Sequence, residues 1–489
     1  MSNLVDRLIK ICIENKLIQQ IDKTYIRNRM LTLFELTEYD SANEDYSSLN
    51  LYETLEKLCD IAVEIKLIDD TLQSRDIFSS KIMNEFLDKP SIINDKFHKL
   101  CEQDPAEATN WFYDLSKASN YIKVDRVAKN KEYTTTSPYG DLKVTINLSK
   151  PEKDPKQIAA EKLAPPTSYP LCLLCVENEG YEGTVKLPDR TNHRMIRIDL
   201  CDREWCLQYS PYLYYNEHCI ILATEHVPMK IDKDTFATLL AFVTELPHYF
   251  VGSNADLPIV GGSILSHEHY QGGNYTFPMT NAEKLFTIQL TKYKDIEAQA
   301  LNWPLSTIRL QSLNKESIVK CSNEILQTWR SYTDEKCDIH WHTEGAPHNT
   351  ITPICRRRGE KYEMDLVLRN NRTTDEFPMG IFHPHSEVHH IKKENIGLIE
   401  VMGLAILPGR LLDELEEVKK FIKGENNNLA DYHLPWATEL KEKYTGQIDD
   451  FVIEALGEKF ATVLEHAGVF KLDDLGIAGF RRFVDALNK

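Results

Sequence analysis

Apolar side chains recur at helical spacing through roughly the first 135 residues. One stripe lies in residues 4–11 and another in residues 51–58, with Asp, Ser and Asn residues between such runs. Apolar positions three and four residues apart share one face of an α-helix. We therefore predict that residues 1–150 form a helical N-terminal region whose many acidic residues lie on solvated faces.

The pattern changes after a segment rich in Pro and charged residues, 150–170, where we place a domain boundary. Short β-branched and aromatic runs follow at 195–200, 218–226 and 257–265, and each predicts a strand. A helical run over 234–246 separates the second strand from the third. Residues 160–310 are therefore predicted to form a first half that mixes strands and helices.

A second set of similar elements follows residue 315. Residues 348–358 and 363–371 predict two antiparallel strands, and residues 398–423 predict a largely helical segment broken near Pro408. We assign residues 315–425 to a second half and residues 430–489 to a helical tail. The predicted fold class is α+β, with antiparallel sheets in two related halves and helical segments at both ends.

Composition and charge narrow the classes of function and the cellular compartment that this sequence suits. The 489 residues carry 57 Lys and Arg against 75 Asp and Glu, and the net charge of −18 argues against nucleic-acid binding. The 11 cysteines are scattered and odd in number, which favours the cytoplasm over an oxidising compartment. The N-terminus lacks an uninterrupted apolar run, and the apolar stretch 395–409 is too short for a bilayer and contains Glu400. We expect a cytoplasmic protein without a membrane partner.

Cys172 and Cys175 form the CxxC pair of the chain. Two thiols three positions apart can bind one metal ion, form a redox pair or simply pack. A thioredoxin-type redox pair is expected in a strand-to-helix turn, whereas this pair follows the Pro-rich segment. Zinc binding is the favoured interpretation, and the other two remain open.

Residues 266–273, SHEHYQGG, combine polar and glycine residues at the end of a predicted strand. In an extended chain alternate side chains share a face, so His267, His269 and Gln271 are expected to point together. Burying them requires a metal, hydrogen bonds or a ligand. The glycine pairs at 261–262 and 272–273 would let a phosphate approach the backbone closely.

The HxHxQ sequence after a glycine-bearing strand, together with CLLC and with His226 at the end of another strand, resembles the histidine-triad superfamily. More closely, residues 165–425 resemble the galactose-1-phosphate uridylyltransferases. The helical N-terminus and the segments 253–265 and 391–403 resemble the class II, bacterial form. The resemblance implies two histidine-triad-like halves.

This resemblance also implies a reaction. His269 would attack the α-phosphorus of UDP-glucose and release glucose 1-phosphate, leaving a covalent uridylyl-histidine. Galactose 1-phosphate would then accept the uridylyl group to give UDP-galactose, so the kinetics would be ping-pong. Gln271 would donate a hydrogen bond to the phosphate oxygens, where charge must be stabilised.

The resemblance further implies a ligand set for zinc and a set of substrate contacts. The zinc would be structural, because two thiolates and two imidazoles close its tetrahedral shell. Its ligands would be Cys172, Cys175, His226 and His267. A second metal is considered near His383 and His385, where an exposed His-rich turn is the alternative.

For the substrate, Glu400 resembles the glutamate that binds hexose hydroxyls in this family. Arg190, Arg194, Asn254 and Lys392 are candidates for binding the diphosphate and uridine, since cationic and amide groups suit phosphate. The family resemblance also implies a homodimer.

Two other functions are considered. One is a histidine-triad hydrolase or phosphorylase of dinucleoside polyphosphates, which would not need a sugar phosphate acceptor. The other is a non-catalytic, zinc-stabilised binding protein, which would form no covalent adduct at His269. The sequence contains no GxxxxGK[ST], GxGxxG or HExxH motif, so P-loop, Rossmann and zincin functions lack support.

Overall fold

The computed structural model describes residues 1–489 apart from 40–44, 150–167, 185 and 263. Most of the predicted boundary segment 150–170 therefore lies outside the described residues. Among the described residues, no helix combines the length and the apolar character needed to cross a membrane.

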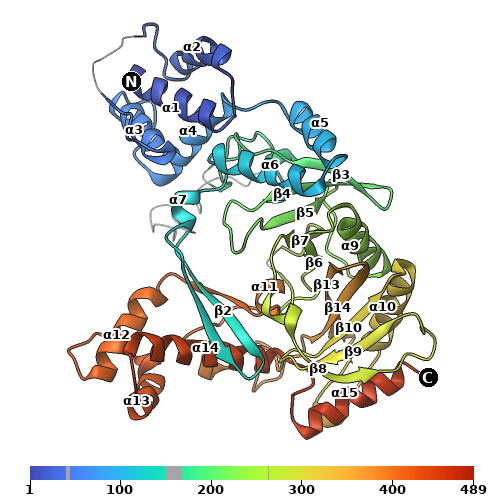
Figure 1. Ribbon diagram of the computed structural model, residues 1–489. Helices are drawn as coiled ribbons and strands as arrows, with labels where there is room; N and C mark the ends of the chain where they lie inside the picture. Colours follow the sequence, from blue (N-terminus) through green and yellow to red (C-terminus); the bar gives the residue numbers. More distant parts are fainter. Residues whose placement is uncertain (40–44, 150–167, 185, 263) are drawn as a thin grey trace.

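The N-terminal helices form two groups (Figure 1). The first group packs around its own apolar core, which includes Leu8 and Leu58. The second group lies beside the edge of the large sheet that ends in β3. The bounds are α1 (Ser2–Glu14), α2 (Lys23–Leu33), α3 (Leu51–Glu64) and α4 (Leu72–Asn84) for the first group, then α5 (Pro90–Cys101), α6 (Pro105–Ala118) and the short α7 (Val124–Val127).

The prediction that residues 1–150 are helical is wrong at its C-terminal end. Strands β1 (Lys131–Ser137) and β2 (Gly140–Asn147) form an antiparallel hairpin there. Alternation in β2 buries Leu142, Val144 and Ile146, a period of two that suits a strand. The helical spacing of apolar residues ends near residue 135, and the shorter period of β2 lies beyond it.

The predicted helical segment 398–423 also contains a strand. It divides into α11 (Leu398–Val401), β15 (Leu404–Pro408) and α12 (Leu411–Lys423), and β15 pairs in parallel with β2. The run of four apolar residues from Leu404 is typical of a parallel strand covered on both faces. The three strands β1, β2 and β15 therefore form a small sheet of their own.

A ten-stranded sheet is the centre of the molecule (Figure 1). Its order is β3-β4-β5-β7-β6-β13-β14-β10-β9-β8, and every pairing in it is antiparallel. The bounds are β3 (Ile196–Leu200), β4 (Arg203–Tyr209), β5 (Cys219–Ala223), β6 (Phe250–Gly252), β7 (His269–Gly273), β8 (Lys284–Ile288), β9 (Glu297–Leu301), β10 (Thr307–Ser312), β13 (Asn349–Arg358) and β14 (Lys361–Asn370). A separate small hairpin joins β11 (His342–Thr343) to β12 (Ala346–Pro347).

The two halves of this sheet repeat one topology. The chain order β3, β4, β5, α9 (Lys233–Glu245), β6, β7 recurs as β8, β9, β10, α10 (Lys315–Arg330), β13, β14. The halves meet where Gly252 of β6 pairs with Ile354 of β13. The predicted first half, residues 160–310, includes β8, β9 and most of β10, but β10 pairs with β14, so these strands join the second half of the sheet. Local patterns do not show which later strand a strand will pair with.

Opposite faces of the sheet support different layers. Val251 and Cys355 face the core that contains α9 and α10, whereas Phe250 and Ile354 face a second core. That second core also contains residues of β2, α11 and the tail. The tail is helical, as predicted, with α13 (Leu434–Lys443), α14 (Ile448–Ala467) and α15 (Asp474–Ala486).

Candidate active site and metal-binding group

Strand β7 begins at His269 and carries Gln271, and His267 lies two residues before the strand. β7 pairs with β5 on one side and β6 on the other. Tyr270 belongs to the core beneath α9, so His269 and Gln271 lie on the opposite face of the strand. The strand therefore presents both polar side chains to the face of the sheet that lies away from α9.

The predicted strand at 257–265 is not present. The described part of this segment makes only an isolated bridge between Ala255 and Gly261. A Cβ atom at Gly261 would lie 2.5 Å from the Ala255 oxygen, and one at Gly262 would lie 2.7 Å from the Asn254 side-chain nitrogen. The glycine pair thus lets this loop fold back against Asn254.

His269 is held with one ring nitrogen available. It is 7% exposed, and its Nδ1 lies 2.8 Å from the His267 carbonyl oxygen. A carbonyl can only accept, so Nδ1 carries the proton and Nε2 keeps its lone pair. Burial lowers the pKa of His269 from its ordinary value, which favours this neutral form. The ring is therefore in the form that a nucleophile requires.

Gln271 is oriented by a histidine that the sequence analysis missed. His218 Nε2 lies 3.3 Å from Gln271 Oε1, and burial lowers the pKa of His218 to about 4. The neutral ring donates its Nε2 proton to the amide oxygen, which leaves the amide NH₂ of Gln271 as a donor. His218 lies two residues before Ile220, which pairs with Gln271, so both side chains lie on one face of the sheet; this register cannot be seen in the sequence.

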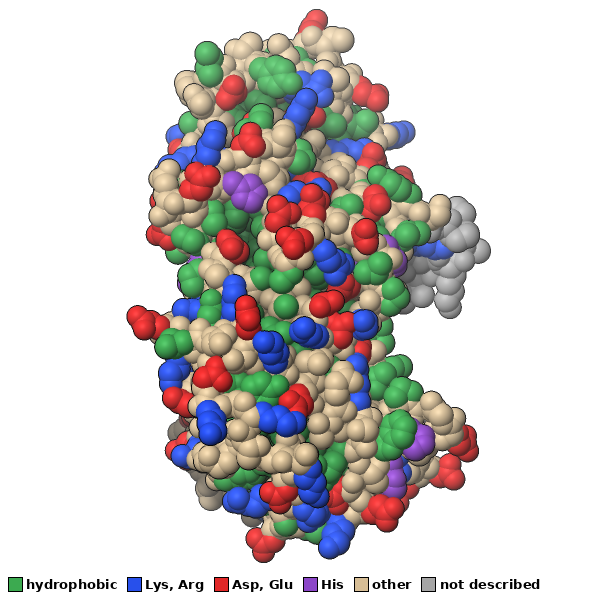
Figure 2. Space-filling model, turned by 90° about the vertical axis from the view of Figure 1, so that its right-hand side faces the viewer, with side chains coloured by type: hydrophobic (Ala, Val, Ile, Leu, Met, Phe, Trp, Pro, Cys, Tyr) green, Lys and Arg blue, Asp and Glu red, His purple; other side chains and the backbone are tan. Residues whose placement is uncertain are grey.

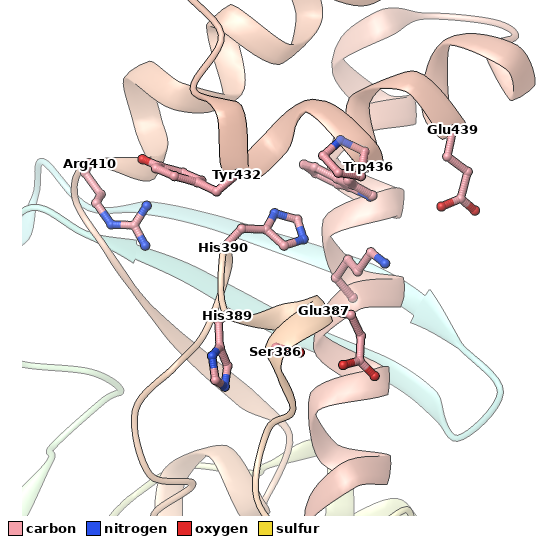
Figure 3. Close-up of a pocket in the computed structure, with 10 residues that line it drawn as sticks. Ser386, Glu387, His389, His390, Arg410, Tyr432, Trp436 and Glu439 are labelled. Carbon is pink, nitrogen blue, oxygen red and sulfur yellow. The ribbon is translucent and has the colours of Figure 1, made fainter. Parts of the chain in front are cut away.

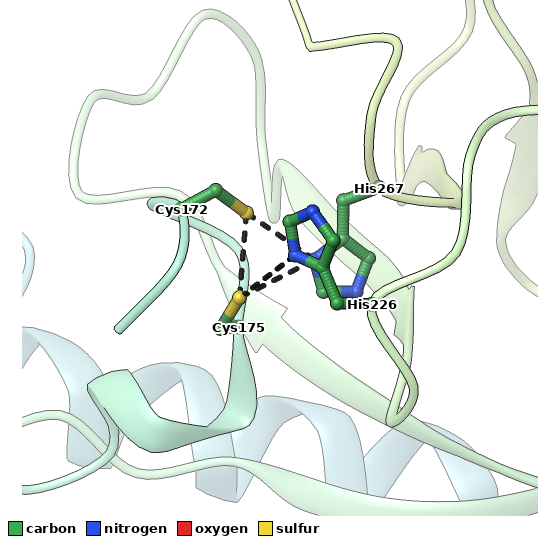
Figure 4. A group of neighbouring side chains, drawn as sticks. All are labelled: Cys172, Cys175, His226 and His267. Carbon is green, nitrogen blue, oxygen red and sulfur yellow. Dashed lines mark hydrogen bonds between the residues drawn. The ribbon is translucent and has the colours of Figure 1, made fainter. Parts of the chain in front are cut away.

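Four predicted metal ligands converge (Figure 4). Cys175 Sγ lies 3.1 Å from His226 Nδ1, and Cys172 Sγ lies 3.3 Å from His267 Nδ1. The two sulfur atoms are 3.5 Å apart, and the four ligand atoms all lie within 4.8 Å of one another. Two thiols and two imidazole nitrogens at this separation fit a tetrahedral zinc ion.

Surrounding hydrogen bonds orient these ligands. His267 Nε2 donates to the Ala223 carbonyl oxygen at 2.8 Å, which leaves Nδ1 facing the sulfur atoms. Asn178 donates from Nδ2 to the carbonyl oxygens of Cys172 and Cys175, both at 2.8 Å. Because His267 also holds His269 through its carbonyl group, the metal-binding group and the candidate nucleophile share one segment of backbone.

Asn254, Lys392 and Glu400 lie in two segments that contact each other. Asn254 Oδ1 accepts a hydrogen bond of 2.8 Å from the backbone N–H of Leu398 at the start of α11. Lys392 Nζ lies 3.0 Å from Glu400 Oε1 and donates to the Ile406 carbonyl oxygen at 3.2 Å. The structure thus gives the buried Glu400 a lysine partner, which the sequence alone did not identify.

The two arginines of residues 189–194 have protein partners. Arg194 donates to the carbonyl oxygens of Asp88, Thr191 and His193 and to Asn84 Oδ1. Arg190 lies over the Tyr121 ring, with its guanidinium carbon 5.6 Å from the ring centre. Arg194 therefore ties this loop to the N-terminal helices, and none of the described hydrogen bonds of either arginine involves His269 or Gln271.

The second histidine cluster is largely enclosed, not an exposed turn. His383 is 2% exposed, and its ring nitrogens lie 3.1 Å from the Pro384 oxygen and 3.3 Å from Asn395 Oδ1. His385 instead groups with Glu387 and His466 at metal-binding separation. Among the described residues, His383 does not group with His385 as a candidate metal ligand, and His466 of the helical tail lies beside His385 instead.

The repeated five-stranded halves and the HxHxQ strand place the chain in the histidine-triad-like class of α+β proteins. Within that class, residues 16–228 match the family model described as the galactose-1-phosphate uridyl transferase N-terminal domain. Residues 243–438 match the corresponding C-terminal domain. The chain belongs to the galactose-1-phosphate uridylyltransferase family.

Full-length relatives carry the same family name. A galactose-1-phosphate uridylyltransferase of Clostridium perfringens strain 13 is 58% identical, with 99% of each chain covered. One from Fusobacterium nucleatum is 47% identical, with 99% of this chain and 98% of the relative covered. Among solved structures, yeast Ap4A phosphorylase Apa2 is 11% identical, with a TM-score of 0.33, covering 60% of this chain and 88% of that one.

Proposed function

We propose that this chain transfers UMP from UDP-glucose to galactose 1-phosphate, with His269 as the nucleophile. The observation that carries the proposal is the hydrogen bond from His269 Nδ1 to the His267 carbonyl oxygen, which leaves Nε2 free to attack. The full-length relatives named galactose-1-phosphate uridylyltransferase support the choice of substrates. The reaction belongs to galactose metabolism.

Two displacements at one phosphorus atom account for the transfer. In the first, the Nε2 lone pair of His269 bonds to the α-phosphorus, and the bond to the bridging oxygen breaks. Glucose 1-phosphate leaves with that electron pair. The charge on the ring of the uridylyl-histidine is shared through Nδ1–H with the His267 carbonyl oxygen. In the second, a phosphate oxygen of galactose 1-phosphate attacks the same phosphorus and His269 is released.

Gln271 would stabilise the charge that develops on the non-bridging oxygens. Because its amide oxygen accepts from His218, its NH₂ group is directed as a donor before substrate binds. We expect Gln271→Ala to slow formation of the uridylyl adduct about 100-fold in single-turnover measurements. Gln299→Ala, on the outer strand β9, is the matched control and should leave the rate unchanged. Equal rates for Gln271→Ala and wild type would remove this role.

The remaining substrate contacts are proposed from their positions. Glu400 would bind hexose hydroxyls, with Lys392 holding its carboxylate in place. Burial lowers the pKa of Lys392, but the carboxylate of Glu400 outweighs it and raises that pKa, so the lysine stays charged. Asn254 would bind near the phosphates because its Oδ1 already positions α11. Arg190 would contribute positive charge, and Arg194 would hold its loop.

Zinc, dimerisation and location complete the proposal. Cys172, Cys175, His226 and His267 would bind a structural zinc ion, which would supply a fixed backbone for the nucleophile. At His385, Glu387 and His466, hydrogen bonds compete with a further metal ion, because His466 Nδ1 accepts from the His385 N–H and Nε2 then donates to Glu387.

We also propose that the protein is a cytoplasmic homodimer. The family resemblance supports the dimer, and the unpaired state of the described cysteines supports the cytoplasm.

The test is a burst experiment, in which wild-type protein is mixed with an excess of UDP-glucose labelled in the glucose. We expect one equivalent of glucose 1-phosphate to be released in a burst, with further release only after galactose 1-phosphate is added. Continued release without the acceptor would instead indicate a hydrolase. No release by folded, metal-replete protein would favour the non-catalytic binding protein.

A further inference from the structure

A hollow separate from the candidate active site lies between the second histidine cluster and the helical tail (Figure 3). Its volume is about 750 Å³, and none of the residues that line it belongs to the candidate active site. The side chains come from η5 (Ser386–Val388), from the start of α12, and from α13 and α14. The lining residues used below are His390, Arg410, Tyr432, Trp436, Glu439 and Lys459.

A chain of hydrogen bonds ends at this hollow. His433 is fully buried, and its Nε2 lies 2.9 Å from Glu414 Oε2. A carboxylate accepts, so His433 Nε2 carries the proton and its Nδ1 accepts from His390 Nδ1 at 2.9 Å. His390 Nε2 is thereby left with a lone pair, and it makes no hydrogen bond to any residue that the structure describes. Figure 3 shows the His390 ring between Tyr432 and Trp436.

Charges around the hollow leave one cation without a partner. Glu414 pairs with Arg410, Glu439 pairs with Lys443 at 2.7 Å, and Glu387 pairs with His466 at 3.2 Å. Lys459 makes no ion pair or hydrogen bond within the described part of the chain. Burial is the main cause that lowers the pKa of His390, and the nearby charge of Lys459 lowers it further. In a protein of net charge −18, a lysine without an ion pair at this hollow favours an anionic ligand.

Two aromatic rings provide a flat wall. The Trp436 ring centre lies 5.2 Å from that of His390, and the Arg410 guanidinium carbon lies 5.9 Å from the Tyr432 ring centre. Aromatic faces pack against sugars and stack with nucleobases. The hollow therefore combines a cationic group, a hydrogen-bond acceptor and an aromatic wall within one space.

We propose that this hollow is a second ligand site, which binds a small phosphate ester that carries hydroxyl groups. Lys459 binds the phosphate. His390 Nε2 accepts a hydrogen bond from a ligand hydroxyl, and the Glu414–His433 chain holds the ring in the tautomer that this requires. Trp436 packs against the sugar or base. A hexose phosphate and a nucleotide share this chemistry.

The test uses protein labelled with 5-fluorotryptophan and fluorine NMR. The chain has six tryptophans, so the Trp436 resonance is assigned by its loss in Trp436→Phe and the other five report on the rest of the fold. The titrants are glucose 1-phosphate, UMP and inorganic phosphate, none of which reacts alone under the proposed function. We expect a saturable shift of the Trp436 resonance with glucose 1-phosphate or UMP, and the stronger of the two identifies the ligand type.

Variants separate the parts of the site. Lys459→Gln should weaken the binding about fivefold or more, and His390→Phe should weaken the esters but not inorganic phosphate. Lys284→Gln, on the edge strand β8, is the matched control and should bind like wild type. The proposal is overturned if Trp436 does not respond to either ester, if inorganic phosphate binds as tightly as both, or if Lys459→Gln binds like wild type. Because the readout is not turnover, failure here leaves the transferase proposal standing.

Discussion

Replacing His269 with glycine is expected to abolish the covalent uridylyl adduct and to lower the transfer rate by about four orders of magnitude or more. No other described histidine is placed to replace it: His267 uses Nε2 for the Ala223 carbonyl oxygen and directs Nδ1 to the thiols. His218 donates its Nε2 proton to Gln271. The measurement is intact-mass spectrometry after mixing each protein with UDP-glucose alone, followed by galactose 1-phosphate.

Two companion variants make this result specific. His269→Gln keeps a polar side chain on β7 and should also give no adduct, which separates the nucleophile from a loss of packing. His340→Gln changes a half-exposed histidine in the loop after α10 and should form the adduct like wild type. An adduct on the glycine variant with the same stoichiometry as wild type would assign the nucleophile to another residue.

Local patterns predicted part of the candidate site, but they did not predict the pairing of distant elements. The two-residue spacing of His269 and Gln271 fixed their common face, and the spacing of Cys172 and Cys175 indicated one half of a ligand set. Both depend only on neighbouring residues. The convergence of His226 required the resemblance to a family, because it is brought in by hydrogen bonds between Glu268 and residues 223–227.

The structural predictions that were wrong concern elements whose conformation depends on residues far away in the sequence. Residues 404–408 are apolar enough for a helix, and their pairing with β2, over 250 residues earlier, makes them a strand. The described residues around Gly261 and Gly262 are apolar, but the chain folds back there against Asn254. His218 was overlooked for the same reason, since its role depends on the register between β5 and β7.

Loss of the metal-binding group is expected to destabilise the protein and to weaken catalysis together. Cys175 is 2% exposed and contacts Cys172, His226 and His267, so Cys175→Ser removes the central thiol of the set. We expect one zinc per chain in wild type and less than about a tenth of that in the variant. The free energy of unfolding should fall by about 5 kcal/mol, because metal binding contributes directly to folding.

Catalysis should fall in folded Cys175→Ser protein about 10- to 100-fold, since His267 would no longer be fixed while its carbonyl group positions His269. Cys201→Ser, at an exposed free cysteine outside the set, is the matched control and should keep zinc, stability and rate. The measurements are metal content by mass spectrometry, thermal unfolding with and without a chelator, and single-turnover rates. A metal-free wild-type protein that unfolds at the same temperature with chelator would show that thiols and imidazoles merely pack, and the coupling between metal and nucleophile would then be absent.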